Sequence, residues 1–220
     1  MAEPPAMAVP AVRVVGGTPA RQRRLRPQGH DTLRRLTEAA IVVLRDRGYH
    51  HTRVDDIVRK ARASHGTFYL YFASKDDLFL ALQEEVTEEM RELADGLPAM
   101  RSSQAGREDL RAWLGRFYDL YEHYYPVIQA WTEANVANPQ LARAGAAVLR
   151  RFTDQLVERI VSVPRSPVAD ARAAALAMVS MVERASFYAV SRVVPVEREH
   201  LLDEMTGILY VGLFGGRGRG

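Results

Sequence analysis

Apolar residues recur at helical spacing along most of the chain, and clusters of Gly, Pro and Ser divide this pattern into segments. The first amphipathic segment is predicted to end at Gly48, because glycine readily adopts the left-handed conformation that stops a helix. Its apolar face consists of Leu33, Leu36, Ala40, Val43 and Leu44. The later part of the chain contains four or five further helical segments and no convincing strand-like alternation. The pattern therefore predicts an all-α fold.

Two short helices are predicted to follow the first segment. The first of them begins at a capping box formed by Thr52 and Asp55. Its apolar face consists of Val54, Ile57, Val58 and Ala61. Ser64 can cap the second short helix, in which Phe68 and Phe72 recur four residues apart and point inward. The residues left on its outer face are His65, Gly66, Thr67, Tyr69 and Tyr71.

A long helix is predicted to start at a second capping box, formed by Ser74 and Asp77, with Lys75 in its first turn. The free N–H groups of a helix N-terminus favour a phosphate, and Lys75 would add a mobile cation there. The apolar face continues through Leu78, Leu82, Val86, Met90, Leu93 and Leu97. Further along, Pro126 is predicted to end one helix and to begin the next, Val127 to Val136.

Two short helices joined by a tight turn have the layout of a helix-turn-helix, and the residues here resemble the N-terminal DNA-binding domain of TetR-family transcriptional regulators. The residues that carry the resemblance are Thr52, Ile57, Ala61, Ser64, Gly66, Thr67, Tyr69, Phe72, Ser74, Lys75 and Leu78. The resemblance covers residues 31–84, about a quarter of the chain.

One position departs from the family pattern. The turn between the two short helices usually carries Gly in this family, whereas this chain has Arg62. A non-Gly residue at positive φ costs on the order of 1 kcal/mol. Either the turn has a different shape, or Arg62 tolerates the strain, with its side chain solvated or reaching a phosphate.

The resemblance implies a three-helix helix-turn-helix DNA-binding domain followed by a helical ligand-binding and dimerisation domain. The expected divisions are a disordered basic arm over residues 1–29, the DNA-binding domain over 30–76, the effector-binding and dimerisation domain over 77–214, and a disordered tail over 215–220. A homodimer that binds a palindromic operator in double-stranded DNA follows from the same resemblance.

The DNA-binding residues expected on this basis include three that face base edges or adjacent phosphates, namely His65, Thr67 and Tyr69. Those expected mainly to position the DNA backbone are Thr52, Arg53, Tyr71 and Lys75. Ser64 and Gly66 complete the predicted DNA-binding set.

Aromatic residues are dense between positions 113 and 131, where they can either fill the core or line a cavity. The resemblance implies an inducer pocket in this region, which is most similar to that of repressors with long apolar tunnels. We expect a hydrophobic small-molecule effector, lipid-like or an acyl thioester. The predicted ligand-binding residues are Trp113, Phe117, Tyr121, Tyr124, Trp131, Asn135, Phe152, Met178 and Glu183.

Residues 171–190 are apolar nearly all round, so this segment must be buried on more than one side. It is either an internal core helix or, with the last helix, half of a two-fold four-helix interface of the kind that TetR-family dimers use. The predicted dimerisation residues are Ala177, Met181, Ala185, Tyr188, Leu202, Met205 and Leu209.

The net charge of +3 is unevenly distributed, because residues 1–29 hold five Arg and one acidic residue. This arm is either inert, or its Arg residues follow phosphates or enter a minor groove. The chain has no Cys, no visible signal peptide and no uncharged helical run near the roughly 20 residues of a membrane span. We therefore expect a cytoplasmic bacterial protein, nucleoid-associated, without a membrane partner.

The six His residues include no pair at the i, i+4 spacing of a helical metal site, and no nucleophile elbow or nucleotide-binding fingerprint is present. The sequence therefore predicts no enzyme, cofactor or metal. The leading prediction is a ligand-responsive homodimeric repressor that its effector releases from the operator. Two other classes stay open: a helical sequestering or interaction module without operator binding, and a nonspecific architectural DNA binder.

Overall fold

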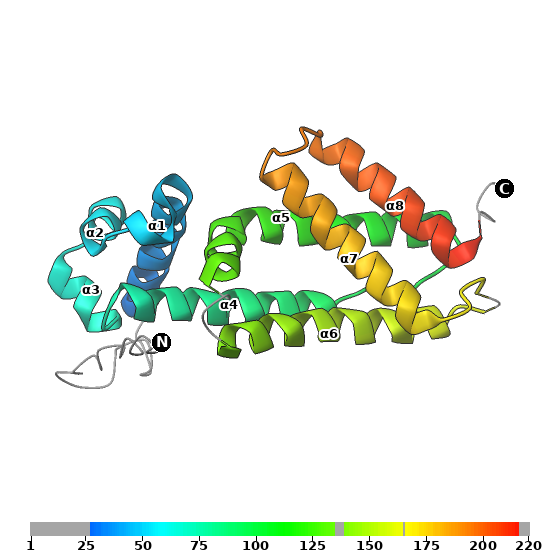
Figure 1. Ribbon diagram of the computed structural model, residues 1–220, viewed down its shortest axis with the longest axis horizontal. Coiled ribbons are helices and arrows are strands. Elements are labelled where there is room, and N and C mark those ends of the chain that lie inside the picture. The colour runs from blue at the N-terminus through cyan, green and yellow to red at the C-terminus, as the bar shows by residue number, and fades with distance from the viewer. Residues whose placement is uncertain (1–26, 135–138, 165, 216–220) are drawn as a thin grey trace, which may run out of the picture.

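The computed structural model of the protein describes residues 27–134, 139–164 and 166–215. Within these ranges all regular structure is helical, which confirms the predicted all-α fold. The helices are α1 (Pro27–His51), α2 (Val54–Ala61), α3 (His65–Tyr71), α4 (Lys75–Asp95), α5 (Gln104–Ala134), α6 (Pro139–Val161), α7 (Ala171–Val190) and α8 (Arg198–Phe214). Figure 1 shows α1, α2 and α3 gathered at one end, with α4 leading from them into a second body that contains α5 to α8.

The three N-terminal helices pack around a small apolar core. Four of its side chains have almost no exposed surface, namely Leu36 of α1, Ile57 of α2, Phe68 of α3 and Phe72, which follows α3. Burying each of these side chains contributes about 1.5–3 kcal/mol. The prediction that both phenylalanines point inward is confirmed.

Side-chain caps fix the starts of α3 and α4. The Ser64 hydroxyl accepts the Thr67 N–H at 3.0 Å, and the Ser74 hydroxyl accepts the Asp77 N–H at 3.1 Å. Both caps were predicted from the sequence and are confirmed. They set the direction in which each helix leaves the preceding turn.

The helical path of α1 breaks at Gly48, which has φ 70° and ψ 167°. The predicted stop is confirmed, although a short helical piece continues to His51. The Gly48 carbonyl accepts the Thr52 hydroxyl at 2.8 Å. Because this bond holds Thr52 against α1, the predicted capping box at Thr52 is wrong, and Arg53 precedes α2 without a side-chain cap.

The turn between α2 and α3 places Arg62 at φ 52° and ψ 46°, the left-handed conformation. The turn therefore has the shape that Gly would give, and Arg62 tolerates the strain, which costs about 1–2 kcal/mol. Nη2 of Arg35 in α1 donates to the carbonyl oxygens of Ala61 at 2.7 Å and Arg62 at 3.1 Å. These bonds from a charged donor satisfy the C-terminal carbonyls of α2 and offset the strain.

In the second body, α4 packs against α5 and α6, α7 packs against α5 and α6, and α8 packs mainly against α5. The most deeply buried side chains there include Leu82, Leu114, Val127, Ile160 and Leu202. The predicted apolar face of the long helix α4 is confirmed, since Leu78, Leu82, Val86 and Met90 are all buried.

Helix α5 runs from Gln104 to Ala134 with Pro126 inside it, so the predicted helix break at Pro126 is wrong. A proline in a helix interior removes one hydrogen bond and costs about 3 kcal/mol. Tyr124, Val127 and Ala130 are buried on either side of the proline. Their burial favours one continuous helix over a break.

The first residue of α1 and the last residue of α8 can be compared with the domain boundaries that the sequence predicts. Helix α1 begins at Pro27, so residues 27–29 are helical, and residues 1–26 of the predicted arm lie outside the described residues. Helix α8 ends at Phe214, and Gly215 caps it with φ 65°. Residues 216–220 of the predicted tail also lie outside the described residues.

Candidate DNA-binding surface, ligand cavity and interface

The outer face of α3 carries the side chains that a groove of DNA could meet. The exposed or half-buried residues are His65, Gly66, Thr67, Tyr69 and Leu70. Tyr69 and Leu70 are each 57% exposed. Tyr71, which the sequence assigned to this face, is buried, so that prediction is wrong. A step of three residues keeps Tyr71 on the same side of the helix as Phe68, which faces the core.

Two of these residues already have hydrogen-bond partners inside the helix-turn-helix. His65 Nε2 lies 2.6 Å from Asp55 Oδ1 in the first turn of α2. This hydrogen bond lowers the pKa of the Asp55 carboxyl. The Thr67 and Ser64 hydroxyls lie 2.9 Å apart. Contacts of His65 or Thr67 with DNA require these bonds to be shared or exchanged.

The start of α4 is tied to the end of α1. Lys75 Nζ donates to the Tyr49 carbonyl at 3.0 Å and lies 4.4 Å from the centre of the Tyr49 ring. The Tyr49 hydroxyl donates to Asp76 Oδ1 at 2.6 Å, and burial together with this carboxylate raises the pKa of Tyr49. Lys75 is therefore held in position, and the predicted mobile cation is wrong. Nearby, Thr52 is buried, whereas Arg53 is exposed.

An open groove between α1 and α2 carries a basic cluster that the sequence did not reveal. Its basic lining residues are Arg34, Arg35, Lys60 and Arg62, together with the acidic Glu38. They come from two helices and a turn, so no spacing along the chain brings them together. Their net positive charge suits a phosphate backbone.

A cavity of about 220 Å³ lies between α4, α5, α6 and α7, and we call it the outer chamber. A second space of about 40 Å³, which we call the inner chamber, lies on the side of α8, which supplies Leu209 and Leu213 to its lining. Phe117, Phe152 and Val179 line both chambers, so the two adjoin. The inner chamber is lined entirely by apolar and aromatic residues.

The chambers bring together six of the nine predicted ligand-binding residues. These are Trp113, Phe117, Tyr121, Phe152, Met178 and Glu183. Tyr124 lines neither chamber, because its hydroxyl points to α4 and lies 2.9 Å from Glu85 Oε1 and 2.7 Å from Glu89 Oε1. The side chain of Trp131 and the whole of Asn135 lie outside the described residues.

The polar ends of the aromatic lining residues have partners. The Tyr121 hydroxyl donates to Glu183 Oε1 at 3.0 Å, and Trp113 Nε1 donates to the Leu93 carbonyl at 3.0 Å. Burial, with the Glu183 carboxylate beside it, raises the pKa of Tyr121. The tyrosine therefore stays protonated and keeps the glutamate oriented.

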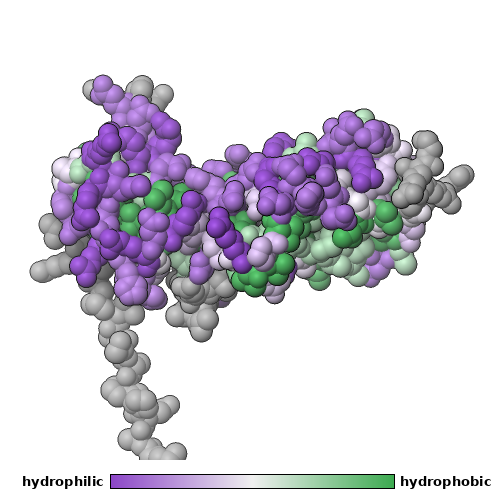
Figure 2. All heavy atoms as spheres, turned by 90° about the horizontal axis from the view of Figure 1, so that it is seen from above, coloured by the Kyte–Doolittle hydropathy of each residue, from purple (hydrophilic) through white to green (hydrophobic). Residues whose placement is uncertain are grey.

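Helices α7 and α8 leave an apolar surface exposed, which we call the α7–α8 face. Its exposed large side chains are Leu176, Tyr188, Ile208 and Val211, with Val193, Val194 and Val196 in the loop between the helices. Figure 2 shows hydrophobic residues gathered along one side of the second body, while the end formed by α1 to α3 is mainly hydrophilic. Contiguous exposed apolar patches of this kind mark interaction surfaces.

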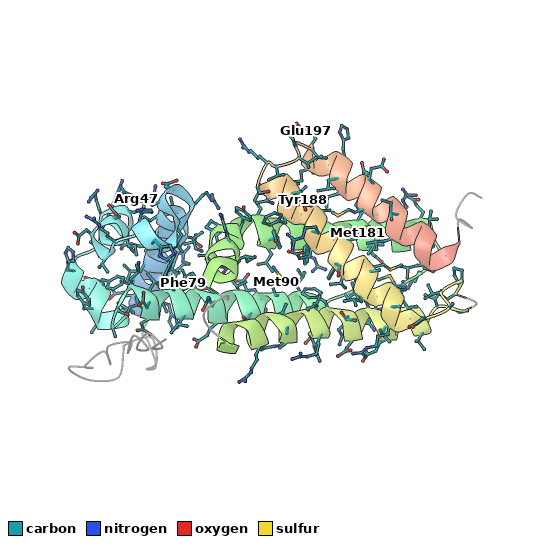
Figure 3. All side chains as sticks on the ribbon, viewed as in Figure 1. Arg47, Phe79, Met90, Met181, Tyr188 and Glu197 are labelled. Carbon is teal, nitrogen blue, oxygen red and sulfur yellow. The ribbon has the colours of Figure 1, made fainter. Side chains whose placement is uncertain are left out.

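The predicted dimerisation residues divide between this face and the core. On α7, Ala177 and Tyr188 are exposed and Met181 and Ala185 are half-buried; Figure 3 labels Met181 and Tyr188 along the helix. On α8 the predicted residues Leu202, Met205 and Leu209 are buried inside the protomer, so their assignment to an interface is wrong. The packing of α8 on α5 takes up that side of the helix, and Ile208 and Val211 face outward instead.

Helix α7 is long and apolar enough to cross a membrane, judged by length and composition alone. It also packs against α5 and α6 within the second body. A core helix that presents one apolar side to a partner has the same composition, so this feature by itself does not indicate a membrane span.

The short helix α2, packed on α1 through Ile57, Val58 and Ala61, the exposed outer face of α3 and the separate cavity-bearing body define a class of protein. This class is the helix-turn-helix DNA-binding proteins with a helical ligand domain. Residues 36–82 match the family model described as "Bacterial regulatory proteins, tetR family". The transcriptional activator FasR of Mycolicibacterium smegmatis is 27% identical over 180 residues, which cover 81% of each chain.

Solved structures agree with these matches. A TetR-like transcriptional regulator from Rhodococcus is 26% identical, with a TM-score of 0.57 over 86% of this chain and 98% of that one. The fold is also shared with Bacillus subtilis FadR in complex with stearoyl-CoA, at 19% identity and a TM-score of 0.58 over 82% of this chain and 98% of that one. The N-terminal domain of the chain therefore belongs to the TetR family of transcriptional regulators, and the matches over most of the chain are also to transcriptional regulators. Because members of this family are DNA-binding regulators, the prediction that it is not an enzyme is confirmed.

Proposed function

We propose that the protein is a homodimeric repressor that binds a palindromic operator through α3 and is released from it by a hydrophobic effector. The observation that carries the proposal is the course of α4. This helix begins at Lys75, beside α3, and supplies Val86, Thr87 and Met90 to the wall of the outer chamber. At about 1.5 Å of rise per residue, the two ends of this path lie on the order of 20 Å apart. A ligand that displaces α4 at the cavity therefore also moves its DNA-binding end.

At the operator, α3 enters the major groove, with Thr67 and Tyr69 nearest the base edges and Arg53 and Lys75 on phosphates. The exposed positions of Tyr69 and Arg53 support these roles. Residues 30–76 act as the DNA-binding domain and residues 77–214 as the effector-binding and dimerisation domain.

Dimerisation uses the α7–α8 face, where two copies pair around a two-fold axis. The exposure of Leu176, Tyr188, Ile208 and Val211 supports this pairing, since it leaves apolar surface that a second copy would cover. The two α3 helices then meet half-sites spaced by about 34 Å, one turn of the duplex, or somewhat more.

The effector binds in the chambers and favours a state in which the two α3 helices no longer match the operator spacing. A coupling free energy of about 1–3 kcal/mol between the two sites would weaken DNA binding by 5- to 150-fold. The apolar lining supports a lipid-like ligand, as do the stearoyl-CoA of the FadR structure and the "Fatty acid metabolism regulator protein" of Bacillus subtilis, which is 38% identical over 50 residues. Because FasR is named an activator, a transcription assay must establish the sign of regulation.

A mobility-shift assay with the DNA upstream of the protein's own gene, repeated across salt concentrations, tests operator binding. Lys75→Ala is expected to weaken binding to all sequences equally, and Thr67→Ala to relax selectivity at one base position. Equal affinity for every DNA would identify a nonspecific architectural binder instead. No binding even at low salt would identify a sequestering module.

The basic arm has its own test. Deleting residues 1–26 leaves α1 intact and is expected to lower DNA affinity and to flatten its salt dependence, because five Arg residues are removed. An unchanged affinity and an unchanged salt slope would mean that the arm is inert.

A further inference from the structure

The outer chamber carries one carboxylate and no basic side chain among the described residues that line it. The carboxylate belongs to Glu183 of α7, and the other polar lining groups are Thr87 and Tyr121. The Thr87 hydroxyl already donates to the Gln83 carbonyl of its own helix at 2.7 Å. The charge and hydrogen-bonding character of the wall therefore depend mainly on Glu183 and Tyr121.

Glu183 is fixed in place but keeps capacity to accept hydrogen bonds. Its Oε1 accepts the Tyr121 hydroxyl at 3.0 Å, which uses the one hydrogen that this tyrosine can donate. Its Oε2 lies 3.5 Å from Arg184 Nη2, too far for a strong hydrogen bond. The Arg184 guanidinium is more than half exposed and lies 4.8 Å from the Phe187 ring, so it belongs to the surface.

A wall with these groups offers acceptors and lacks donors. A ligand head that carries a carboxylate or phosphate would meet the negative charge of Glu183, which the more than half exposed Arg184 at 3.5 Å compensates only in part from outside the chamber lining. A thioester or ester carbonyl would find no free donor among the polar lining groups. An ammonium group would gain a charge-assisted hydrogen bond in a mostly apolar setting, where such bonds are strong.

We propose that the cavity binds a single-chain amphiphile with a positively charged, hydrogen-bond-donating head, which Glu183 accepts while the apolar chain extends into the inner chamber. Tyr121 acts as a positioning residue that holds the carboxylate. This inference rests on the proposed effector site and specifies its ligand class, which differs from the acidic or acyl-thioester ligands of a fatty-acid sensor.

Isothermal titration of the full-length protein with three probes of equal chain length tests the ligand class. The probes are dodecylamine, 1-dodecanol and dodecanoate, each kept below its micelle concentration at neutral pH. Dodecylamine is expected to bind roughly tenfold or more tighter than dodecanoate, with dodecanol between them. Equal affinities, or dodecanoate binding tighter than dodecylamine, would overturn the proposal.

Substitutions then assign the preference to one side chain. Glu183→Gln keeps the shape of the residue and is expected to reduce the amine-to-acid ratio to within about threefold, mainly by weakening dodecylamine. Glu158→Gln makes the same charge change at an exposed position of α6 outside both chambers and should leave the ratio unchanged. If both variants lower the ratio equally, the overall charge of the protein causes the preference and the proposal is wrong.

Tyr121→Phe tests the positioning role. The ring remains, so dodecanol affinity should stay within about threefold, whereas dodecylamine should weaken because Glu183 is no longer held. Circular dichroism checks that each variant is folded. If no probe binds at all, the effector site of the proposed function fails together with this inference. If the acid binds best, only the ligand class fails and the proposed function stands.

Discussion

Replacing Arg35 by Met is expected to loosen the turn that orients α3. In the native protein Arg35 Nη2 donates to the carbonyls of Ala61 and Arg62, at 2.7 and 3.1 Å. Arg62 sits in the left-handed conformation, and these bonds hold it there. Methionine keeps the apolar stem of the side chain and removes only the charged donor.

The size of the effect follows from these contacts. A hydrogen bond from a charged donor contributes about 1.5–3 kcal/mol, but the bond to Arg62 is exposed and contributes less than the half-buried bond to Ala61. We expect a loss of about 1.5 kcal/mol in the free energy of unfolding. For a chain of this size that corresponds to a fall in Tm of about 3–6 °C.

Urea unfolding followed by circular dichroism, at one fixed protomer concentration, measures the loss. Arg34→Met is the matched control, because it makes the same substitution at the neighbouring position. The Arg34 side chain is 73% exposed, and its Nη2 lies 3.6 Å from the similarly exposed Asp31 carboxylate. Such an exposed pair contributes about 0–1 kcal/mol. Equal stabilities of the Arg35 and Arg34 variants would refute the idea that Arg35 supports the turn. Operator affinity should fall more with Arg35→Met than with Arg34→Met, because both substitutions remove one positive charge from the groove but only the first loosens the turn.

Three further substitutions test other parts of the fold. Ile208→Glu on the α7–α8 face should raise the dimer dissociation constant by about tenfold or more in analytical ultracentrifugation, whereas Leu80→Glu, on an exposed side of α4, should not. Arg62→Gly should stabilise the protein by about 0.5 kcal/mol in urea unfolding, because strain relief slightly exceeds the entropic cost of glycine. Burial raises the pKa of the Glu85 carboxyl above its ordinary 4.5. The protonated carboxyl therefore stabilises the fold fully below pH 4.5, and this stabilisation is lost as the pH rises through the raised pKa. Glu85→Gln should therefore be more stable than the wild type at pH 7 and lose this advantage toward pH 4.5; a constant difference would contradict the assignment.

Features that depend on neighbours in the chain could be predicted from the sequence. The caps at Ser64 and Ser74 need only a hydroxyl and an N–H three residues later, and the break at Gly48 needs only the absence of a Cβ. Thr52 and Asp55 have the same spacing as Ser74 and Asp77, yet Thr52 does not cap α2. The carbonyl of Gly48, freed by the break in α1, accepts the Thr52 hydroxyl instead, and that competition is not encoded in the spacing.

Features that depend on packing between helices could not be predicted. The apolar residues of helix α8 are spread around the helix, so their pattern cannot say which side meets α5 and which side stays exposed. The sequence therefore assigned Leu202, Met205 and Leu209 to an interface, although they fill the core. In the same way, the aromatic spacing that correctly gathers Phe117 and Tyr121 at the cavity also included Tyr124, which packs toward Glu85 and Glu89.

The contacts between the two bodies offer the proposed effector a second route, besides α4, by which its binding would move the DNA-binding helices. Tyr121 and Ile128 of α5 line the outer chamber on either side of Pro126. Between them, His123 meets α1, with its Nε2 3.7 Å from Glu38 Oε1 and its carbonyl 3.4 Å from Arg45 Nη2. Proline removes a backbone hydrogen bond and makes a helix easier to bend at that point. In the proposed mechanism, a ligand that displaces Tyr121 or Ile128 therefore acts on the part of α5 that contains Pro126 and that contacts α1.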